Sequence, residues 1–266
     1  MVAGLSRSAY QYRRQQQENG VKADKYAELR AWLRIFADNH RRWGYRRAFY
    51  TARAHGFDVG RDVIRKLWRQ EGLRVMPRRQ RKRTITGNHT PRVENATHPG
   101  HVWALDFQFD SDYRGRTLKI CNVIDEFTRQ HVGFRVARNI TAADVIELLD
   151  VLSLQYGRPE VLRMDNGPEF IAKSLASWAA EESTMRAFIP PGQPWHNGFV
   201  ESLHNRMRDE LLEDNLFEGC ADLVQALTIW SDRYNQHHPH SALGYLSPNQ
   251  YCLTWQNNNQ KITMNT

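Results

Sequence analysis

The stretch R-M-D-N-G-P-E-F at 163–170 decides how the rest of the chain is interpreted. A short run, V-L-R-M at 161–164, leads into Asp165 and reads as a buried strand. Asn166-Gly167 supplies the turn directly after it. A carboxylate at a strand end, followed at once by a tight turn, is placed to project from the edge of a sheet into a cleft. We therefore expect Asp165 to face a cleft.

Two further carboxylates hold comparable positions. Asn197 fits an N-cap, so Glu201 falls in the first turn of the next helix, where the helix dipole favours an ionised carboxylate. Asp106 lies in another strand-like run, V-W-A-L-D-F at 102–107. We expect Asp106, Asp165 and Glu201 to meet around divalent metal.

The reason is electrostatic. Carboxylates that converge on one point repel each other, and burial increases the cost, unless a cation neutralises them. Mg²⁺ prefers oxygen ligands and keeps several waters, which leaves room for phosphate oxygens. Two such ions about 3.5–4 Å apart can clamp the attacking and leaving oxygens of a phosphoryl displacement.

The spacing of the acids follows a known pattern. Asp106 and Asp165 are separated by 58 residues, and Asp165 and Glu201 by 35. This arrangement resembles the catalytic core shared by retroviral integrases and many bacterial transposases. Five sequence motifs, in order along the chain, make the resemblance more specific: W-A-L-D-F at 103–107, V-I-D-E-F-T-R at 123–129, D-N-G-P-E-F at 165–170, P-G-Q-P-W-H-N-G-F-V-E-S at 191–202 and R-Y-N-Q-H-H-P-H-S-A-L-G-Y-L-S-P at 233–248. Together they resemble the second-reading-frame (OrfB-type) part of transposases of insertion-sequence family three. The resemblance covers roughly residues 25–255.

The resemblance implies a fold and a reaction. The fold would be α/β, a ribonuclease-H-like integrase catalytic core with a mixed five-stranded sheet and flanking helices, preceded by an all-α helix-turn-helix domain. Asp106, Asp165 and Glu201 would be the catalytic, metal-binding acids of a DDE transposase, with two Mg²⁺ ions that Mn²⁺ can replace. Water would cut an element's end to free a 3′-hydroxyl, which then attacks another phosphodiester directly.

The same resemblance implies partners. The protein would bind double-stranded DNA, both the terminal inverted repeats and the target, as a homo-oligomer on paired ends. An upstream-frame (OrfA-type) product would act as partner or fusion. The departure is L-H-N at 203–205, where the family more often shows Phe-Asn with a small residue, which puts DNA contacts by His204 and Asn205 in question.

Composition agrees with a nucleic-acid partner. The 266 residues carry a net charge of +8, enough length for one large or two small domains, and the bland alternative is a merely basic soluble protein. Three dispersed cysteines suit a reducing compartment, and no apolar run is long enough to span a membrane. We expect a soluble protein in the bacterial cytoplasm, associated with the nucleoid.

The N-terminal third reads as helices at about 22–39, 44–55 and 61–71, with Gly56 and Gly72 as stops. The third helix turns an apolar stripe inward and carries cations elsewhere, which suggests a helix-turn-helix. The alternative is a plain three-helix packing unit with a solvated basic face. The candidate DNA-binding residues of this helix are Arg61, Arg65, Lys66 and Arg69.

A basic linker follows. R-R-Q-R-K-R at 78–83 repels itself unless an anion lies against it, so it is either a phosphate-tracking segment or a disordered tether. Its candidate DNA-binding residues are Arg78, Arg79, Arg81, Lys82 and Arg83. The domains predicted are an N-terminal tail at 1–21, the helix-turn-helix domain at 22–76, the linker at 77–100, the catalytic core at 101–255 and a C-terminal tail at 256–266.

The core begins with three strand-like runs, at 102–109, 119–124 and 131–136, with a hairpin turn at 112–116. Thr141 and Asp144 form a capping box for a helix to Tyr156. A helix near 171–182 and a short run at 186–189 follow the Asp165 strand.

The breaker-rich loop at 190–198 reads as an active-site loop, with ordinary connection as the alternative. Candidate DNA-binding residues in it and after it are Trp195, His196, Asn197, Asn205 and Arg208. Arg208 stands seven residues after Glu201, where the family places a Lys or Arg; a surface arginine is the alternative. On the Glu201 helix we expect one face with Glu201, Asn205, Arg208 and Leu212, and a buried stripe of Val200, Leu203, Met207 and Leu211.

Rival groups need an explanation. Asp125, Glu126 and Glu169 lie near the predicted acids, and Asp125 reads as a hydrogen-bond acceptor at a turn. The histidines at 237, 238 and 240 lack partners at zinc spacing and read as structural or DNA-facing.

Two alternatives to the transposase stay open. A ribonuclease-H-like nuclease would cut DNA without joining it, and a non-catalytic DNA-binding regulator of the element would do neither.

Overall fold

The structure is a computed structural model that describes Ser8, Gln11, residues 24–73, Val75, 95–189 and 197–264, with side chains to residue 260. It divides into two compact units, Met1–Met76 and Pro77–Thr266. The linker cations predicted to bind DNA, and Trp195 and His196, lie outside the described residues. No helix within the described ranges combines the length and apolar character of a membrane span.

The first unit packs three helices around one apolar core: α2 (Ala27–Asn39), α3 (Tyr45–Ala54) and α4 (Arg61–Gln70). Helix α2 begins later than predicted because the Asp24 carboxylate accepts the N–H of Tyr26 and holds a turn there. Gly56 and Gly72 adopt φ of 90° and 71° just after α3 and α4, as the sequence indicates. The predicted inward residues Ile64, Leu67 and Trp68 are buried.

The second unit is built on a five-stranded sheet with the order β3-β2-β1-β4-β5. Strands β1, β2 and β3 are antiparallel, whereas β4 and β5 run parallel to β1, so the predicted mixed sheet is confirmed. The strands are β1 (Val102–Ser111), β2 (Thr117–Asp125), β3 (His131–Ala137), β4 (Val161–Met164) and β5 (Met185–Phe188).

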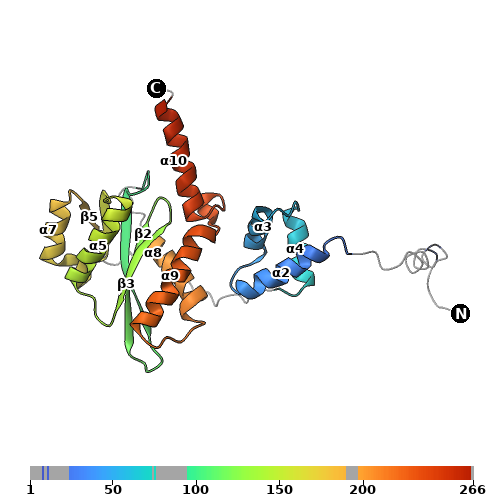
Figure 1. Ribbon diagram of the computed structural model, residues 1–266, viewed down its shortest axis with the longest axis horizontal. Helices are drawn as coiled ribbons and strands as arrows, with labels where there is room; N and C mark the ends of the chain where they lie inside the picture. Colours follow the sequence, from blue (N-terminus) through green and yellow to red (C-terminus); the bar gives the residue numbers. More distant parts are fainter. Residues whose placement is uncertain are drawn as a thin grey trace, which may run out of the picture. The chain divides into compact units, whose positions relative to one another are not determined.

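Helices cover both faces of this sheet (Figure 1). One face packs on α5 (Ala142–Tyr156), α6 (Pro168–Ile171) and α7 (Lys173–Glu181). The other packs on α8 (Gly198–Met207), the π-helical segment η2 (Arg208–Leu212) and α9 (Cys220–His237). The capping box of Thr141 and Asp144 starts α5 as predicted. Trp103 and Leu105 point into the α5 layer and Ala104 into the α8 layer, as strand alternation requires.

Two predicted helices differ in detail. The helix expected near 171–182 is two pieces, because Pro168 starts α6 early and the extended backbone at Ala172 (ψ 140°) interrupts the helix before α7. At the C-terminus, η3 (Ser241–Leu243) leads to α10 (Pro248–Met264), which continues through most of the range predicted as a tail.

Candidate active site

Strand pairing brings Asp106 and Asp165 to equivalent positions. Ala104 of β1 is the register partner of Arg163 of β4 in a parallel pair. Two residues further along both strands stand Asp106 and Asp165, the latter one residue beyond the end of β4. Side chains two apart share a face, so both carboxylates belong to the face that α8 covers.

Helix α8 brings Glu201 to the same face. Val200, Leu203 and Met207 are buried against the sheet, as the predicted stripe requires. The side chain of Gln108 on β1 donates to the His204 carbonyl at 3.2 Å and ties the helix to that strand. One helical turn from Glu201, Nδ1 of His204 lies 3.8 Å from Oδ2 of Asp106. Glu201 therefore belongs to the helical turn of α8 whose residue His204 lies beside Asp106.

The electrostatics of Asp106 link the three acids. Burial raises its pKa to about 7, and the Asp165 and Glu201 carboxylates raise it too, against the lowering effect of the Phe107 N–H. That N–H donates to Oδ1 of Asp106 at 2.8 Å. The like charges of its two acidic neighbours therefore disfavour ionisation of Asp106. Asp165 and Glu201 therefore lie close enough to Asp106 to influence its pKa.

The histidines near Asp106 supply no counter-charge. Burial, with a smaller effect of Arg208, lowers the pKa of His204 to about 4. Burial, with a smaller effect of His204, lowers the pKa of His131 to about 3. Both imidazoles are therefore neutral near pH 7. Asp106 forms no ion pair with a lysine or arginine among the described residues. The imidazole of His204 is turned toward Asp106.

The donor set fits a hard divalent cation. All three acids offer oxygen, the ligand type that Mg²⁺ prefers, and Asp165 is exposed, with Oδ1 accepting the N–H of Gly167 at 2.9 Å. Within the parts of the chain that the structure describes, no three His, Cys, Asp or Glu side chains already lie close enough to hold an ion. A cation bound by these oxygens would offset the repulsion that raises the pKa of Asp106.

The rival carboxylates are each engaged elsewhere. Asp125 is buried and accepts the N–H groups of Phe127 and Thr128 at 2.8 Å, which confirms its reading as a turn acceptor. Glu126 forms a buried ion pair with Arg163, and Glu169 pairs with Lys119. Of the three histidines, His238 is buried against Tyr234, and His240 packs on the same ring.

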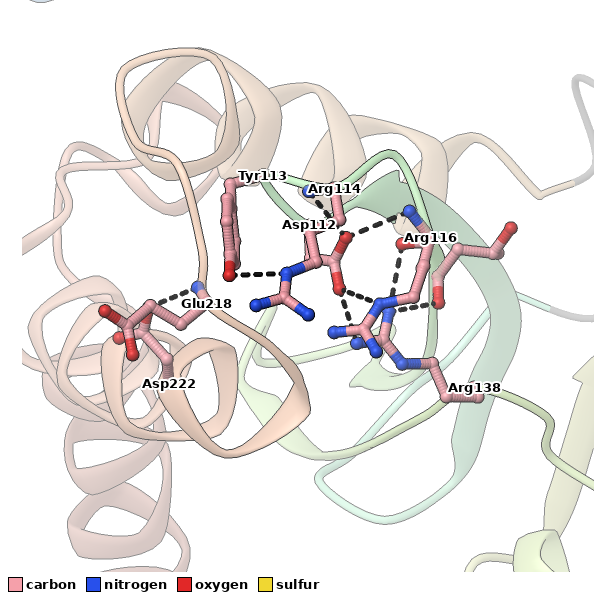
Figure 2. Close-up of polar contacts among 8 residues, drawn as sticks. Asp112, Tyr113, Arg114, Arg116, Arg138, Glu218 and Asp222 are labelled. Carbon is pink, nitrogen blue, oxygen red and sulfur yellow. Dashed lines mark hydrogen bonds and ion pairs between the residues drawn. The ribbon is translucent and has the colours of Figure 1, made fainter.

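Asp112, a buried aspartate directly after β1, contrasts with the half-buried Asp106. Figure 2 shows Asp112 at the β1–β2 hairpin, where its carboxylate accepts both a backbone and a side-chain N–H from Arg116 and a guanidinium N–H from Arg138 at 2.6 Å. Burial opposes ionisation, yet these donors hold the pKa of Asp112 well below its usual range. Arg116 of the hairpin and Arg138, which follows β3, are therefore committed to a structural carboxylate.

Two predictions about α8 need correction. Asn197 stands at the N-cap, but its side chain makes no cap hydrogen bond. Leu212 is buried and does not share the face of Glu201, because the backbone turns π-helical from Arg208 onward and shifts the later residues around the axis. Arg208 donates to the carbonyl of Phe109 at 3.1 Å, three residues beyond Asp106 on β1. Asn205 is exposed.

The basic residues of α4 line one surface groove. Arg65, Lys66 and Arg69, with Asp62 and Gln70, enclose about 530 Å³. Arg61 is exposed at the start of the same helix, and the Arg65 guanidinium lies 5.8 Å from the Tyr45 ring centre. These cations face away from the core of Ile64, Leu67 and Trp68, as the sequence predicts.

Sequence reasoning missed the residues that connect the acids to their surroundings. The Glu126–Arg163 pair and the contact of Arg129 with Phe199 were not predicted as site features. The motif V-I-D-E-F-T-R at 123–129 contains Glu126 and Arg129 and could have indicated them, but only its Asp125 was assigned a role from the sequence.

Comparison with known proteins agrees with this geometry. Residues 96–194 and 184–248 match the family described as integrase core domain, and 23–82 match the HTH-like domain. The chain is 33% identical over 252 residues to the 31.7 kDa protein of insertion element IS407 from Burkholderia multivorans, covering 94% of this chain and 88% of that protein. It is 23% identical over 258 residues to the transposase for insertion sequence element IS629 from Shigella sonnei, covering 92% and 86%.

Among solved structures, a chain in the cryo-electron microscopy structure of the simian T-cell lymphotropic virus intasome in complex with PP2A regulatory subunit B56 gamma shares the fold. The TM-score is 0.53 at 16% identity, covering 84% of this chain and 74% of that chain.

Proposed function

The chain belongs to the insertion-sequence transposases of family three, OrfB type, with an integrase core domain, and on this premise we propose that Asp106, Asp165 and Glu201 are the acids of its DNA-cutting and DNA-joining site. It is a DDE transposase, a polynucleotidyl transferase. The observation that carries the assignment is the raised pKa of Asp106. Burial and the neighbouring carboxylates of Asp165 and Glu201 raise this pKa to about 7.

The acids act together on one phosphodiester. Asp106 and Asp165, each two residues beyond the Ala104–Arg163 pair of β1 and β4, would hold divalent cation from the sheet, and Glu201 would complete the site from α8. Two Mg²⁺ ions, or Mn²⁺ in their place, would neutralise the carboxylates and polarise the scissile phosphate when bound. Because His204 is neutral near pH 7, it does not form a charged pair with Asp106, and the Asp106 carboxylate stays available as an oxygen ligand.

The reaction proceeds by direct transesterification. Water cuts at an element's end and frees a 3′-hydroxyl, and that hydroxyl attacks another phosphodiester with no covalent protein intermediate. Arg208, beside the β1 carbonyl of Phe109, would hold a DNA phosphate near the acids. Asn205 of α8 and its N-cap residue Asn197, together with Trp195 and His196, would contact the DNA end.

The partners follow from the same assignment. The α4 residues Arg61, Arg65, Lys66 and Arg69 would contact terminal inverted repeats, and the cations at 78–83 would track the phosphates of end or target DNA. The protein would work in the bacterial cytoplasm as a homo-oligomer on paired ends, with an upstream-frame partner. We also propose the domain bounds 22–76 and 101–255 for binding and catalysis.

One assay tests the proposal against its rivals. The protein is incubated with end-containing oligonucleotides and Mg²⁺, and cleaved and joined products are resolved. We expect both products from the wild type, neither from Asp165→Asn, and both from Asp110→Asn, a matched carboxylate on the same strand as Asp106. Cleavage without joining would favour a nuclease. Binding without either product would favour a regulator.

A further inference from the structure

The turn after β2, residues Asp125–Arg129, is built around one buried carboxylate. Asp125 accepts the N–H groups of Phe127 and Thr128, and its other oxygen accepts that of Gly100 at 2.6 Å. The N–H of Arg129 returns to the Asp125 carbonyl at 2.9 Å, and Arg129 adopts a left-handed φ of 63°. Such a backbone is costly for a residue with a side chain, so its surroundings must stabilise it.

From this turn, Glu126 reaches the strand of one acid. Its carboxylate lies 3.0 Å from the Arg163 guanidinium, and both residues are at most 3% exposed. Arg163 stands two residues before Asp165, on the same face of the sheet. A buried ion pair fixes geometry more firmly than an exposed one, because neither partner can turn to water.

From the same turn, Arg129 reaches the helix of another acid. Its guanidinium carbon lies 3.5 Å from the ring centre of Phe199, and one of its N–H groups also donates to the Glu126 carbonyl. Phe199 is the second residue of α8 and stands two residues before Glu201. A guanidinium over an aromatic face is attractive and directional.

The start of α8 needs such a contact. Its N-cap residue Asn197 makes no side-chain cap hydrogen bond, so the helix lacks the usual side-chain support for its first turn. Glu201 lies in that first turn. The ring of Phe199, held under Arg129, is a described contact that fixes the turn from outside the helix.

We propose that Asp125–Arg129 is a positioning turn, in which Arg129 sets Glu201 through Phe199 and Glu126 sets Asp165 through Arg163. The turn continues β2, which pairs with β1 through Trp103 and Asp125. It would therefore fix the positions of Glu201 and Asp165 relative to β1, the strand that carries Asp106. The inference rests on the proposed function of the three acids. Arg129 touches no reacting atom in this scheme and acts through its neighbours.

The test uses the full chain, end-containing oligonucleotides and a titration of Mg²⁺. Arg129→Met and Phe199→Leu should each raise the Mg²⁺ concentration for half-maximal cleavage by about 10-fold, within the range that residues behind metal ligands produce. Saturating Mg²⁺ should recover much of the rate. Arg129→Lys, which keeps the cation on the same left-handed backbone, should lie between wild type and Arg129→Met. The double variant should be no worse than either single one.

A matched control comes from the hairpin. Arg114 also lies over an aromatic ring, with its guanidinium carbon 5.0 Å from the Tyr113 ring centre, in the β1–β2 hairpin (Figure 2). Arg114→Met should leave the Mg²⁺ dependence unchanged. Thermal unfolding and DNA affinity without metal, measured for every variant, separate a positioning effect from a loss of fold.

The outcomes are distinguishable. If the wild type cleaves and Arg129→Met keeps the same Mg²⁺ half-point, the positioning proposal is wrong and the function stands. The same holds if Arg129→Met loses activity only in proportion to lost folded protein, or if Arg129→Lys is no better than Arg129→Met. A wild type without cleavage would instead contradict the proposed function.

Discussion

Asp106 lies within β1, and Asp112 lies six residues later in the hairpin that follows it. Burial disfavours ionisation of both carboxylates, but their surroundings shift their pKa values in opposite directions. Asp112 is surrounded by donors from Arg114, Arg116 and Arg138, and its pKa stays low in spite of burial. Asp106 receives one backbone N–H, and its pKa rises to about 7 through burial and through Asp165 and Glu201.

The difference separates an acid that stabilises the fold from one that, in the function proposed above, takes part in the chemistry. Matched donors make the Asp112 site complete within the protein, so nothing else is needed there. The Asp106 cluster concentrates negative charge that the described residues leave uncompensated at this carboxylate, a cost the fold carries until a cation binds.

The largest effect should come from removing the charge at Asp106. Asp106→Asn should reduce cleavage and joining by about 10³-fold or more, because metal catalysis contributes several kcal/mol of transition-state stabilisation. The folded protein should be at least as stable as the wild type at pH 7, since a repulsive charge is gone. Product analysis and thermal unfolding check this, and a variant that is both active and unstable would reverse the distinction.

The second effect is the converse at the hairpin. Asp112→Asn should lower the unfolding midpoint at pH 7 by several degrees, because the Arg116 and Arg138 guanidiniums lose their buried partner. Cleavage per folded molecule should stay within about threefold of wild type. A loss of activity at unchanged stability would mean that the hairpin takes part in the reaction.

The two acids should also respond to pH with opposite sign. The folded pKa of Asp106 is raised from 3.8 to about 7, so its stabilising contribution is fully present below about pH 4 and is lost as pH rises to about 7. Asp106→Asn should therefore gain stability relative to wild type over that window, on the order of 2–4 kcal/mol in the absence of metal. The folded pKa of Asp112 is depressed, so its contribution is present above about pH 4 and is lost as pH falls.

Denaturant titrations of wild type, Asp106→Asn and Asp112→Asn from pH 3 to 8 measure both slopes. Parallel curves for the two variants would show that the two carboxylates do not differ in the way described.

The smallest effect compares committed arginines with solvated ones. Arg65→Ala in the α4 groove should weaken DNA binding about 3- to 10-fold across sequences and lower the salt-dependence slope by about one. Arg116→Ala in the hairpin should lower stability with little change in DNA affinity. Binding measured at several salt concentrations checks both, and equal loss of affinity in the two variants would argue against a special role for α4.

Much of this organisation was predictable from local signals. The helix stops at Gly56 and Gly72 and the capping box at Thr141 act within a few residues, so the sequence alone indicates them. The three acids were predicted from their spacing and their family resemblance.

What could not be predicted depends on contacts between distant residues. Sequence alone does not distinguish Asp106 from Asp112, because both follow strand-like residues and only the fold brings Arg138 to one and Asp165 to the other. The Glu126–Arg163 pair joins residues from two separate strand ends. The π-helical turn at Arg208–Leu212 changes the helical period, so the expected face for Leu212 was wrong.

Binding of Mn²⁺ in the presence of an end-containing oligonucleotide, followed by electron paramagnetic resonance, tests the acid cluster most directly. We expect the wild type and Asp110→Asn to bind Mn²⁺ alike, and Asp106→Asn, Asp165→Asn and Glu201→Gln each to lose at least one ion or about 10-fold in affinity. Unchanged Mn²⁺ binding in all three acid variants would contradict the claim that these carboxylates form the metal site.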